Sequence, residues 1–386
     1  MNRPGSGTAS REGLTELYGR IDTLLRRRAK GFPRREEPTW SQLDAALGEA
    51  AARLRDLAAT DPAAAPALDE ELLARPVFVV GYPKTGTTLL LGLLDGHPQL
   101  VVVPGETRWF TDPEPTLAQL HGRWIRYLVN PSGQEPFWLL GSPGGDEDPY
   151  LAFTARLLAL AAAHPERDLL TALVATFGEN AAGARAWVEK TPLHVFQVDR
   201  IRGWFPAARF VQVVRDPRAT VAAIRRFARH GWRTDVDETV DGVARALVQA
   251  EEAPRTYGRD VYLVVRYEDV VAAAERELRR VADFVGVDWS DSLLRPTLAG
   301  VPMRANSAWL DRRVVGEIHD RSLDDGSRDL DRRTLALVHA RTSRGGRALG
   351  YEVPRVGRIR AAVIEATERV RRLAGAGRPN SSSTRD

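Results

Sequence analysis

Residues Pro76–Leu94 read PVFVVGYPKTGTTLLLGLL, and this segment decides the fold of the chain. It begins with a continuous apolar run, Val77–Val80, whose β-branched side chains are typical of a strand buried on both faces. A glycine-bearing loop follows at 81–88, and leucines then return at helical spacing. This order directs backbone N–H groups and the positive end of a helix dipole at one place. The segment therefore predicts an anion site, suited to a nucleotide phosphate.

The loop differs from a Walker A motif in the position of its lysine. Gly81 and Gly86 have the G-x-x-x-x-G spacing, but Thr87 stands where an NTPase carries lysine, and Lys84 lies inside the loop. A cation placed this early suits an anion shorter than a polyphosphate. Two alternatives stay open: a P-loop kinase of a small molecule, and a turn in which the glycines only relieve strain.

The same loop resembles the 5′-phosphosulfate loop of sulfotransferases that use 3′-phosphoadenosine 5′-phosphosulfate (PAPS). The resemblance implies that the co-substrate is PAPS, that no metal is needed, and that the loop residues bind the 5′-phosphosulfate. Those residues are Lys84, Thr85, Gly86, Thr87 and Thr88.

Length, composition and charge limit the kinds of protein that this chain can be. The chain has 386 residues, 43% of them hydrophobic, which predicts a substantial core in one large domain with an appendage or at most two domains. A net charge of +4 with 51 acidic residues gives little support for nucleic-acid binding. Zero cysteine excludes disulfides and thiolate metal sites. No signal-peptide core or membrane-spanning run is found, so we expect a cytoplasmic enzyme.

Lysine is rare in this chain. Only Lys30, Lys84 and Lys190 are lysines among the 55 basic residues. Two of the three lie in the motifs that carry chemistry, where a compact ammonium is hard to replace with the planar fork of arginine.

An acidic residue follows the second predicted strand, 99–103, in the sequence Pro104-Gly-Glu-Thr-Arg108. Its distance from the phosphate loop resembles that in tyrosylprotein sulfotransferases and related bacterial enzymes, which implies that Glu106 is the general base for the acceptor hydroxyl. We expect Arg108 to orient Glu106 or contact the acceptor, and Trp109 to join the acceptor site. The alternatives are a surface Glu–Arg pair contributing under about 1 kcal/mol and an ordinary core tryptophan.

Three further positions match the family. In WVEKTP (187–192), Lys190 matches the second lysine beside the sulfuryl group, while the nearby His194 is interpreted as structural. In RFVQVVRD (209–216), Arg215 matches the arginine that binds the 3′-phosphate. The family's serine eight residues later is Ala223 here, a loss for which Thr220, Arg225 or Arg226 could compensate. Tyr267 is expected near the adenine, although a tyrosine at a strand end often only packs.

Alternating strands and helices predict a three-layer, P-loop-like α/β fold with a central parallel sheet. The five expected strands are 76–81, 99–103, 186–189, 208–214 and 260–266. We predict three regions: a helical N-terminal extension (1–75), a catalytic domain (76–352), and a C-terminal helix with a disordered tail (353–386). Within the catalytic domain, 107–185 is predicted to be a helical, aromatic cap over the acceptor.

These features predict sulfuryl transfer from PAPS to a hydroxyl of a small molecule, glycan or lipid. The N-terminal helices could supply a homo-oligomer interface. Besides the kinase, a non-catalytic nucleotide-binding protein remains an alternative.

Overall fold

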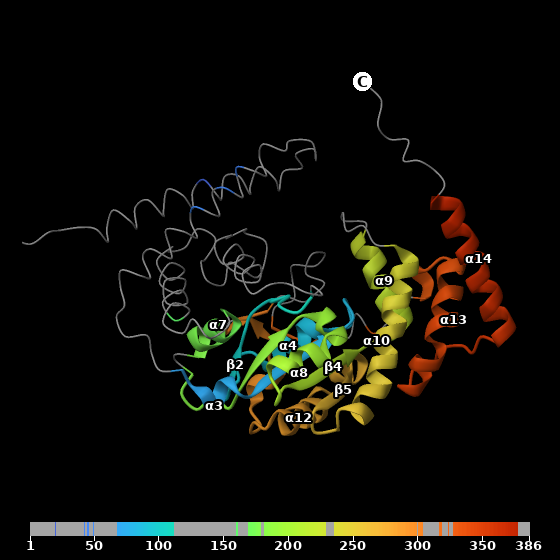
Figure 1. Cartoon of the computed structure of the whole chain (residues 1–386). Helices are drawn as coiled ribbons and strands as arrows, with labels where there is room; N and C mark the ends of the chain where they lie inside the picture. The colour runs from blue at the N-terminus through green and yellow to red at the C-terminus, as the bar shows by residue number, and fades with distance from the viewer. Residues whose placement is uncertain are drawn as a thin grey trace, which may run out of the picture.

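The computed structural model describes most of the predicted catalytic domain and the C-terminal helices (Figure 1). The described residues are 20, 42, 45, 49, 68–111, 160, 169–178, 181–228, 235–298, 300–303, 316–318, 323 and 327–376. The predicted N-terminal extension and cap, and the tail after 376, lie largely outside these residues, so the predicted division into regions stays a prediction.

A five-stranded parallel sheet forms the centre of the molecule, in the order β2-β3-β1-β4-β5. The strands are β1 (Pro76–Gly81), β2 (Leu100–Val102), β3 (Ala186–Lys190), β4 (Arg209–Val214) and β5 (Tyr262–Arg266). All five predicted strands are present, and the predicted α/β fold is confirmed. The phosphate-loop strand is the middle one, so the residues after β3 and β4 flank the loop on either side.

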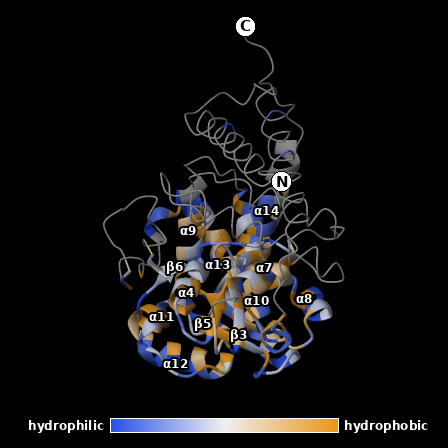
Figure 2. Ribbon diagram, turned by 90° about the vertical axis from the view of Figure 1, so that its left-hand side faces the viewer, coloured by the Kyte–Doolittle hydropathy of each residue, from blue (hydrophilic) through white to orange (hydrophobic). Residues whose placement is uncertain are grey.

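Successive side chains of β1 point to opposite faces of the sheet, and this divides the core into two layers. Phe78 and Val80 pack on one face with β2, α7 (Leu169–Gly178) and α8 (Val198–Trp204). Val77 and Val79 pack on the other face with α4 (Thr87–Leu94) and α12 (Ala274–Val285). In Figure 2 the central strands are apolar, while hydrophilic segments lie on the surrounding helices. Burial of β1 on both faces explains its uninterrupted apolar sequence.

Several short elements complete this part of the fold. They are α3 (Glu70–Leu73), η2 (Pro192–Phe196), α11 (Tyr267–Ala272), η3 (Asp291–Leu294), η4 (Ser327–Asp329) and the antiparallel pair β6 (Thr297–Leu298) and β7 (Val301–Pro302).

Four helices pack together at the β5 side of the sheet (Figure 1). They are α9 (Pro217–Ala228), α10 (Val236–Thr256), α13 (Arg332–Ala348) and α14 (Arg358–Ala376). Apolar side chains of α9, α10 and α13 form a third buried cluster, separate from the two sheet layers. Within the described part of the chain, no helix is both long and apolar enough to cross a bilayer.

Candidate active site

The phosphate loop is a tight turn between β1 and α4. The Thr85 amide and hydroxyl both donate to the carbonyl of Tyr82, at 3.2 and 2.8 Å. Lys84 and Gly86 both have positive φ, 71° and 107°. Such a backbone is costly for a lysine, and it is the kind of local strain that concentrates at functional sites. The first amides of α4, which begins at Thr87, have no acceptor within the helix and so are suited to an anion.

Tyr267 and Arg215 close one side of this loop. A Cβ at Gly86 would lie 2.3 Å from Cδ2 of Tyr267, so the tyrosine ring occupies the space that the glycine leaves. The Arg215 guanidinium lies 4.9 Å from the centre of the same ring and donates to the carbonyl of Lys84 at 3.2 Å. Glycine is therefore required at 86 both by its φ and by the ring, and Arg215, predicted to bind the 3′-phosphate, is held next to this loop.

Lys190 joins the phosphate loop to the predicted base. Its ammonium donates to Glu106 Oε1 at 2.9 Å and to the Thr88 hydroxyl at 3.2 Å, and its side chain is 3% exposed. Glu106 is one-third exposed, and its second oxygen lies 3.5 Å from the largely exposed Arg108 guanidinium. The predicted base, second lysine and loop hydroxyl are thus in one cluster, open to solvent on the Glu106 side.

Lys84 belongs electrostatically to the same cluster. Burial lowers its pKa, the charge of Glu106 opposes that shift, and the charge of Lys190 adds to it; the pKa lies below the ordinary lysine value of 10.5. Two lysines facing one carboxylate give the site an excess of positive charge, as an anionic co-substrate requires.

The loop that carries Glu106 is fixed by a buried network that the sequence analysis missed. Glu189 Oε1 accepts from the Thr107 amide (3.1 Å), the Thr107 hydroxyl (2.5 Å) and the Thr191 hydroxyl (2.7 Å). Glu189 Oε2 pairs with His194 Nδ1 at 3.0 Å. Both Glu189 and His194 are fully buried. His194, interpreted from the sequence as structural, belongs to this network. The signal in the sequence was a second charged residue, Glu189, next to Lys190 in an otherwise apolar strand.

Trp109 is placed differently from our expectation. It is fully buried and packs in the same core cluster as Phe110 and Trp187. We therefore correct its assignment from acceptor site to core.

None of the three residues considered as a substitute for the missing serine at Ala223 is available in the observed arrangement. The Thr220 hydroxyl is buried and donates to the Asp216 carbonyl at 3.0 Å. Arg225 pairs with Asp331 and Arg226 with Asp329, at 2.5 and 3.2 Å. Among the described residues, Arg215 therefore remains the one that we propose for the 3′-phosphate.

Comparisons with known proteins find similar sequences and a similar fold. Residues 76–291 match the profile described as "Sulfotransferase family". Protein-tyrosine sulfotransferase of Drosophila melanogaster is 28% identical over 221 residues, which cover 56% of this chain and 39% of that protein. Protein-tyrosine sulfotransferase 1 of Danio rerio is 26% identical over 310 residues, covering 77% of this chain and 79% of that protein. The chain thus spans under half the length of the first relative and most of the second.

A solved structure shares the fold. The sulfotransferase domain from the curacin biosynthetic pathway superposes with a TM-score of 0.50 at 19% identity, over 72% of this chain and 98% of that domain. Of the described residues, no group of three or more His, Asp or Glu is arranged to hold a metal ion.

Proposed function

The chain belongs to the sulfotransferase family, and on that premise we propose that it transfers a sulfuryl group from PAPS to an acceptor hydroxyl. The observation that carries the proposal is the position of the Lys190 ammonium, within hydrogen-bonding distance of both Glu106 and Thr88. This contact joins a candidate base to a loop suited to the 5′-phosphosulfate. The other groups for the co-substrate are Lys84, the loop amides at Thr85–Thr88, and Arg215 with Tyr267.

The loop already has a defined arrangement whose charges and amides suit an anionic nucleotide. The strained φ of Lys84 and the Tyr267 ring against Gly86 belong to the structure already. Arg215, 9% exposed, is held at the loop by its hydrogen bond to Lys84 and by the tyrosine ring. A site formed in advance loses less conformational entropy on binding.

The proposed reaction is an in-line displacement. The acceptor oxygen forms a bond to sulfur while the bond from sulfur to the bridging phosphate oxygen breaks, and its electron pair leaves with adenosine 3′,5′-bisphosphate. Glu106 takes the acceptor proton. Lys190 leaves Glu106 and, with Lys84, stabilises negative charge on the sulfuryl and bridging oxygens. Arg108, the exposed cation beside Glu106, is the residue we propose to meet the acceptor.

The kinase alternative has less support. Asp216 is the only candidate Walker B aspartate that we identified, and its two carboxylate oxygens accept from the Arg218 side chain at 3.1 and 2.7 Å. A carboxylate engaged in this way is poorly placed to hold Mg²⁺ for a polyphosphate.

Calorimetric titration with adenosine 3′,5′-bisphosphate, AMP, ATP and Mg-ATP tests the donor. We expect metal-independent preference for the bisphosphate, and at least a tenfold loss of that affinity in Arg215→Ala, since a charge-assisted contact is worth about 1.5–3 kcal/mol. Preference for Mg-ATP would favour the kinase hypothesis over the sulfotransferase hypothesis.

Turnover with PAPS tests the chemistry. The acceptor panel contains a tyrosine peptide, phenols, sugars and hydroxylated lipids. Glu106→Gln should lower kcat about 10²–10⁴-fold and leave bisphosphate affinity unchanged. Full activity of that variant would remove Glu106 as base, and tight binding with no turnover on any acceptor would favour a non-catalytic protein.

A further inference from the structure

The loop that carries Glu106 depends on side chains outside it for its shape. Gly105 and Arg108, the residues before and after Glu106-Thr107, both have positive φ, 85° and 52°. A non-glycine residue rarely adopts such a backbone by itself, so the surrounding structure must impose it.

The constraint comes from residues 189–194, on β3 and the turn after it. Glu189 accepts from the Thr107 amide, the Thr191 hydroxyl accepts from the Arg108 amide at 2.9 Å, and His194 Nε2 accepts from the Phe110 amide at 3.1 Å. Three amides of one loop are therefore bound by three side chains of one segment.

The hydrogens in this network have one consistent arrangement. Because His194 Nε2 accepts from the Phe110 amide, the proton is on Nδ1 and is donated to Glu189. Because the Thr191 hydroxyl donates to Glu189, its lone pairs face the Arg108 amide. An acceptor with two oxygens is needed at 189, and a carboxylate meets that requirement.

The ionised carboxylate is stabilised inside the protein. Burial raises the pKa of Glu189, but its interactions with His194, Thr107 and Thr191 outweigh burial, so the pKa lies below its ordinary value of 4.5. All four hydrogen bonds go to the loop or to the two residues that themselves hold the loop.

We propose that Glu189 is a positioning residue, whose buried carboxylate, together with Thr191 and His194, holds the 105–110 loop so that Glu106 faces the reacting centre. The inference rests on the proposed function. Successive side chains of a strand point to opposite faces, and so β3 places the positioning carboxylate and the Lys190 ammonium back to back. One short segment thus fixes both the base and the cation that contacts it.

The main test compares wild type, Glu189→Gln, Glu106→Gln and the double variant. An amide at 189 presents N–H to His194 Nδ1, which forces the imidazole proton onto Nε2, opposite the Phe110 N–H. We expect kcat to fall about 10–100-fold, the range for small misplacements of a reacting group, with bisphosphate affinity within about twofold of wild type. The double variant should lose little beyond Glu106→Gln, because residues that act through one group are non-additive.

A matched control separates positioning from general loss of stability. Tyr262→Phe removes another buried hydrogen bond, from Tyr262 to Gln212 at 2.7 Å, without touching the loop. It should lower stability and leave kcat unchanged. Thr107→Val, which deletes one donor to Glu189 but keeps the amide, should lower kcat less than Glu189→Gln.

Amide hydrogen exchange tests the inference without turnover. Glu189→Gln should speed exchange in a peptide spanning 103–111 and leave the phosphate-loop peptide unchanged, while Tyr262→Phe changes neither. Unchanged exchange, or fully additive kcat losses in the double variant, would overturn the proposal. Faster exchange in a protein whose wild type transfers no sulfuryl group would instead overturn the proposed function and leave only a structural role for Glu189.

Discussion

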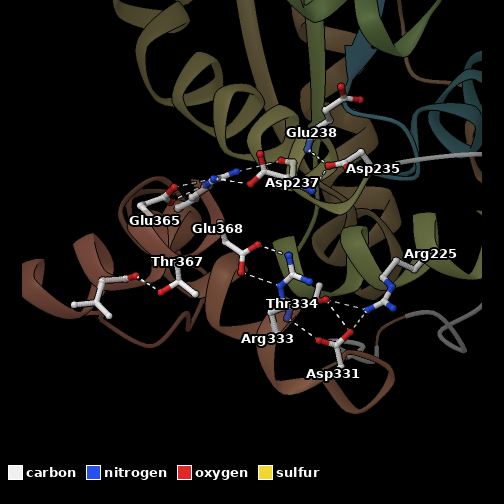
Figure 3. Close-up of polar contacts among 12 residues, drawn as sticks. Arg225, Asp235, Asp237, Glu238, Asp331, Arg333, Thr334, Glu365, Thr367 and Glu368 are labelled. Carbon is white, nitrogen blue, oxygen red and sulfur yellow. Dashed lines mark hydrogen bonds and ion pairs between the residues drawn. The ribbon is translucent and has the colours of Figure 1, made fainter. Parts of the chain in front are cut away.

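Two polar networks in this molecule use similar groups but differ in burial. Around Glu189 the carboxylate and its imidazole partner are fully buried. Among α9, α10, α13 and α14 the pairs keep some exposure: the side chains of Arg225 and Asp331 are 34% and 51% exposed (Figure 3), and those of Arg341 and Asp237 are 12% and 13% exposed. Water can replace a lost partner in the second network but not in the first, so we expect equal deletions to have unequal effects.

The two networks also join different parts of the chain. The Glu189 network lies within residues 76–291, the span that matches the family profile. The second network attaches α13 and α14, beyond that span: Arg341 of α13 reaches Glu365 of α14 at 2.7 Å and Asp237 of α10 at 2.8 Å. Fully buried polar contacts shape the site, and ion pairs that keep some exposure to solvent attach helices next to it.

The largest effect is expected for Glu189→Ala. It leaves the Thr107 amide and the His194 imidazole buried without their acceptor, and breaking a buried pair in this way costs about 3–5 kcal/mol. Urea unfolding followed by circular dichroism measures the loss. If Glu189→Ala and Tyr262→Phe lose similar amounts of unfolding free energy, water must enter the space left by Glu189. The two networks would then not differ as we propose.

Gly86→Ala should have the next largest effect. Alanine must adopt a φ near 107° and displace the Tyr267 ring, whose Cδ2 would lie 2.3 Å from the new Cβ. Such strain costs about 1–3 kcal/mol, and the moved ring also releases Arg215. We expect bisphosphate affinity to fall together with the unfolding free energy. Gly203→Ala, in α8 where an added Cβ meets nothing within 4 Å, is the control for a change of one methyl group; unaltered affinity in Gly86→Ala would contradict the packing argument.

The dependence of stability on acid pH should also reveal the buried carboxylate of Glu189. The folded pKa of Glu189 lies below 4.5, so the folded state binds fewer protons than the unfolded state, and stability falls as pH decreases from 4.5 through the folded pKa. Glu189→Gln should make the unfolding free energy less dependent on pH in this range. An identical acid dependence in both proteins would show that the pKa of Glu189 is the same in the folded and unfolded states, and a stability that rises on acidification would show that the folded state keeps it protonated.

The smallest effect is expected for Arg225→Gln. The pKa of Asp331 is lowered first by the Thr334 amide and then by Arg225, so the helix cap remains when the arginine is lost. We expect the unfolding free energy to fall by under about 1 kcal/mol, as it does when an exposed ion pair is lost. The difference from wild type should shrink further in 1 M salt, where the Debye length is about 3 Å. A larger loss of unfolding free energy that does not change with salt would show that the packing of α9 against α13 depends on this contact.

The sequence predicted the sheet well because the strands are local signals, and the candidate site residues were proposed from equally local motifs. The apolar runs identify the strands, and Lys84, Glu106 and Lys190 each lie in a short motif at a strand end. Parallel strands then bring these ends to one edge, where the structure joins Glu106, Lys190 and Thr88.

The remaining features depend on contacts between distant residues. Glu189 is a charged residue in an apolar strand, and its role appears only when the 105–110 loop, about 80 positions earlier in the chain, folds over it. Arg225 looked available for a phosphate because its partner, Asp331, lies 106 positions away. Trp109 follows a site motif directly, and a local pattern cannot tell a buried indole from a ligand-binding one.

The lowered pKa of Lys84 has a consequence for chemical labelling. An amine acylates only in its neutral form, and a lower pKa raises that fraction at pH 8. With three lysines in the whole chain, and Lys190 almost fully buried, an activated ester should modify Lys84 well before Lys190. Peptide mapping after brief treatment would show the order, and protection of Lys84 by adenosine 3′,5′-bisphosphate would turn the reagent into a direct reporter of site occupancy.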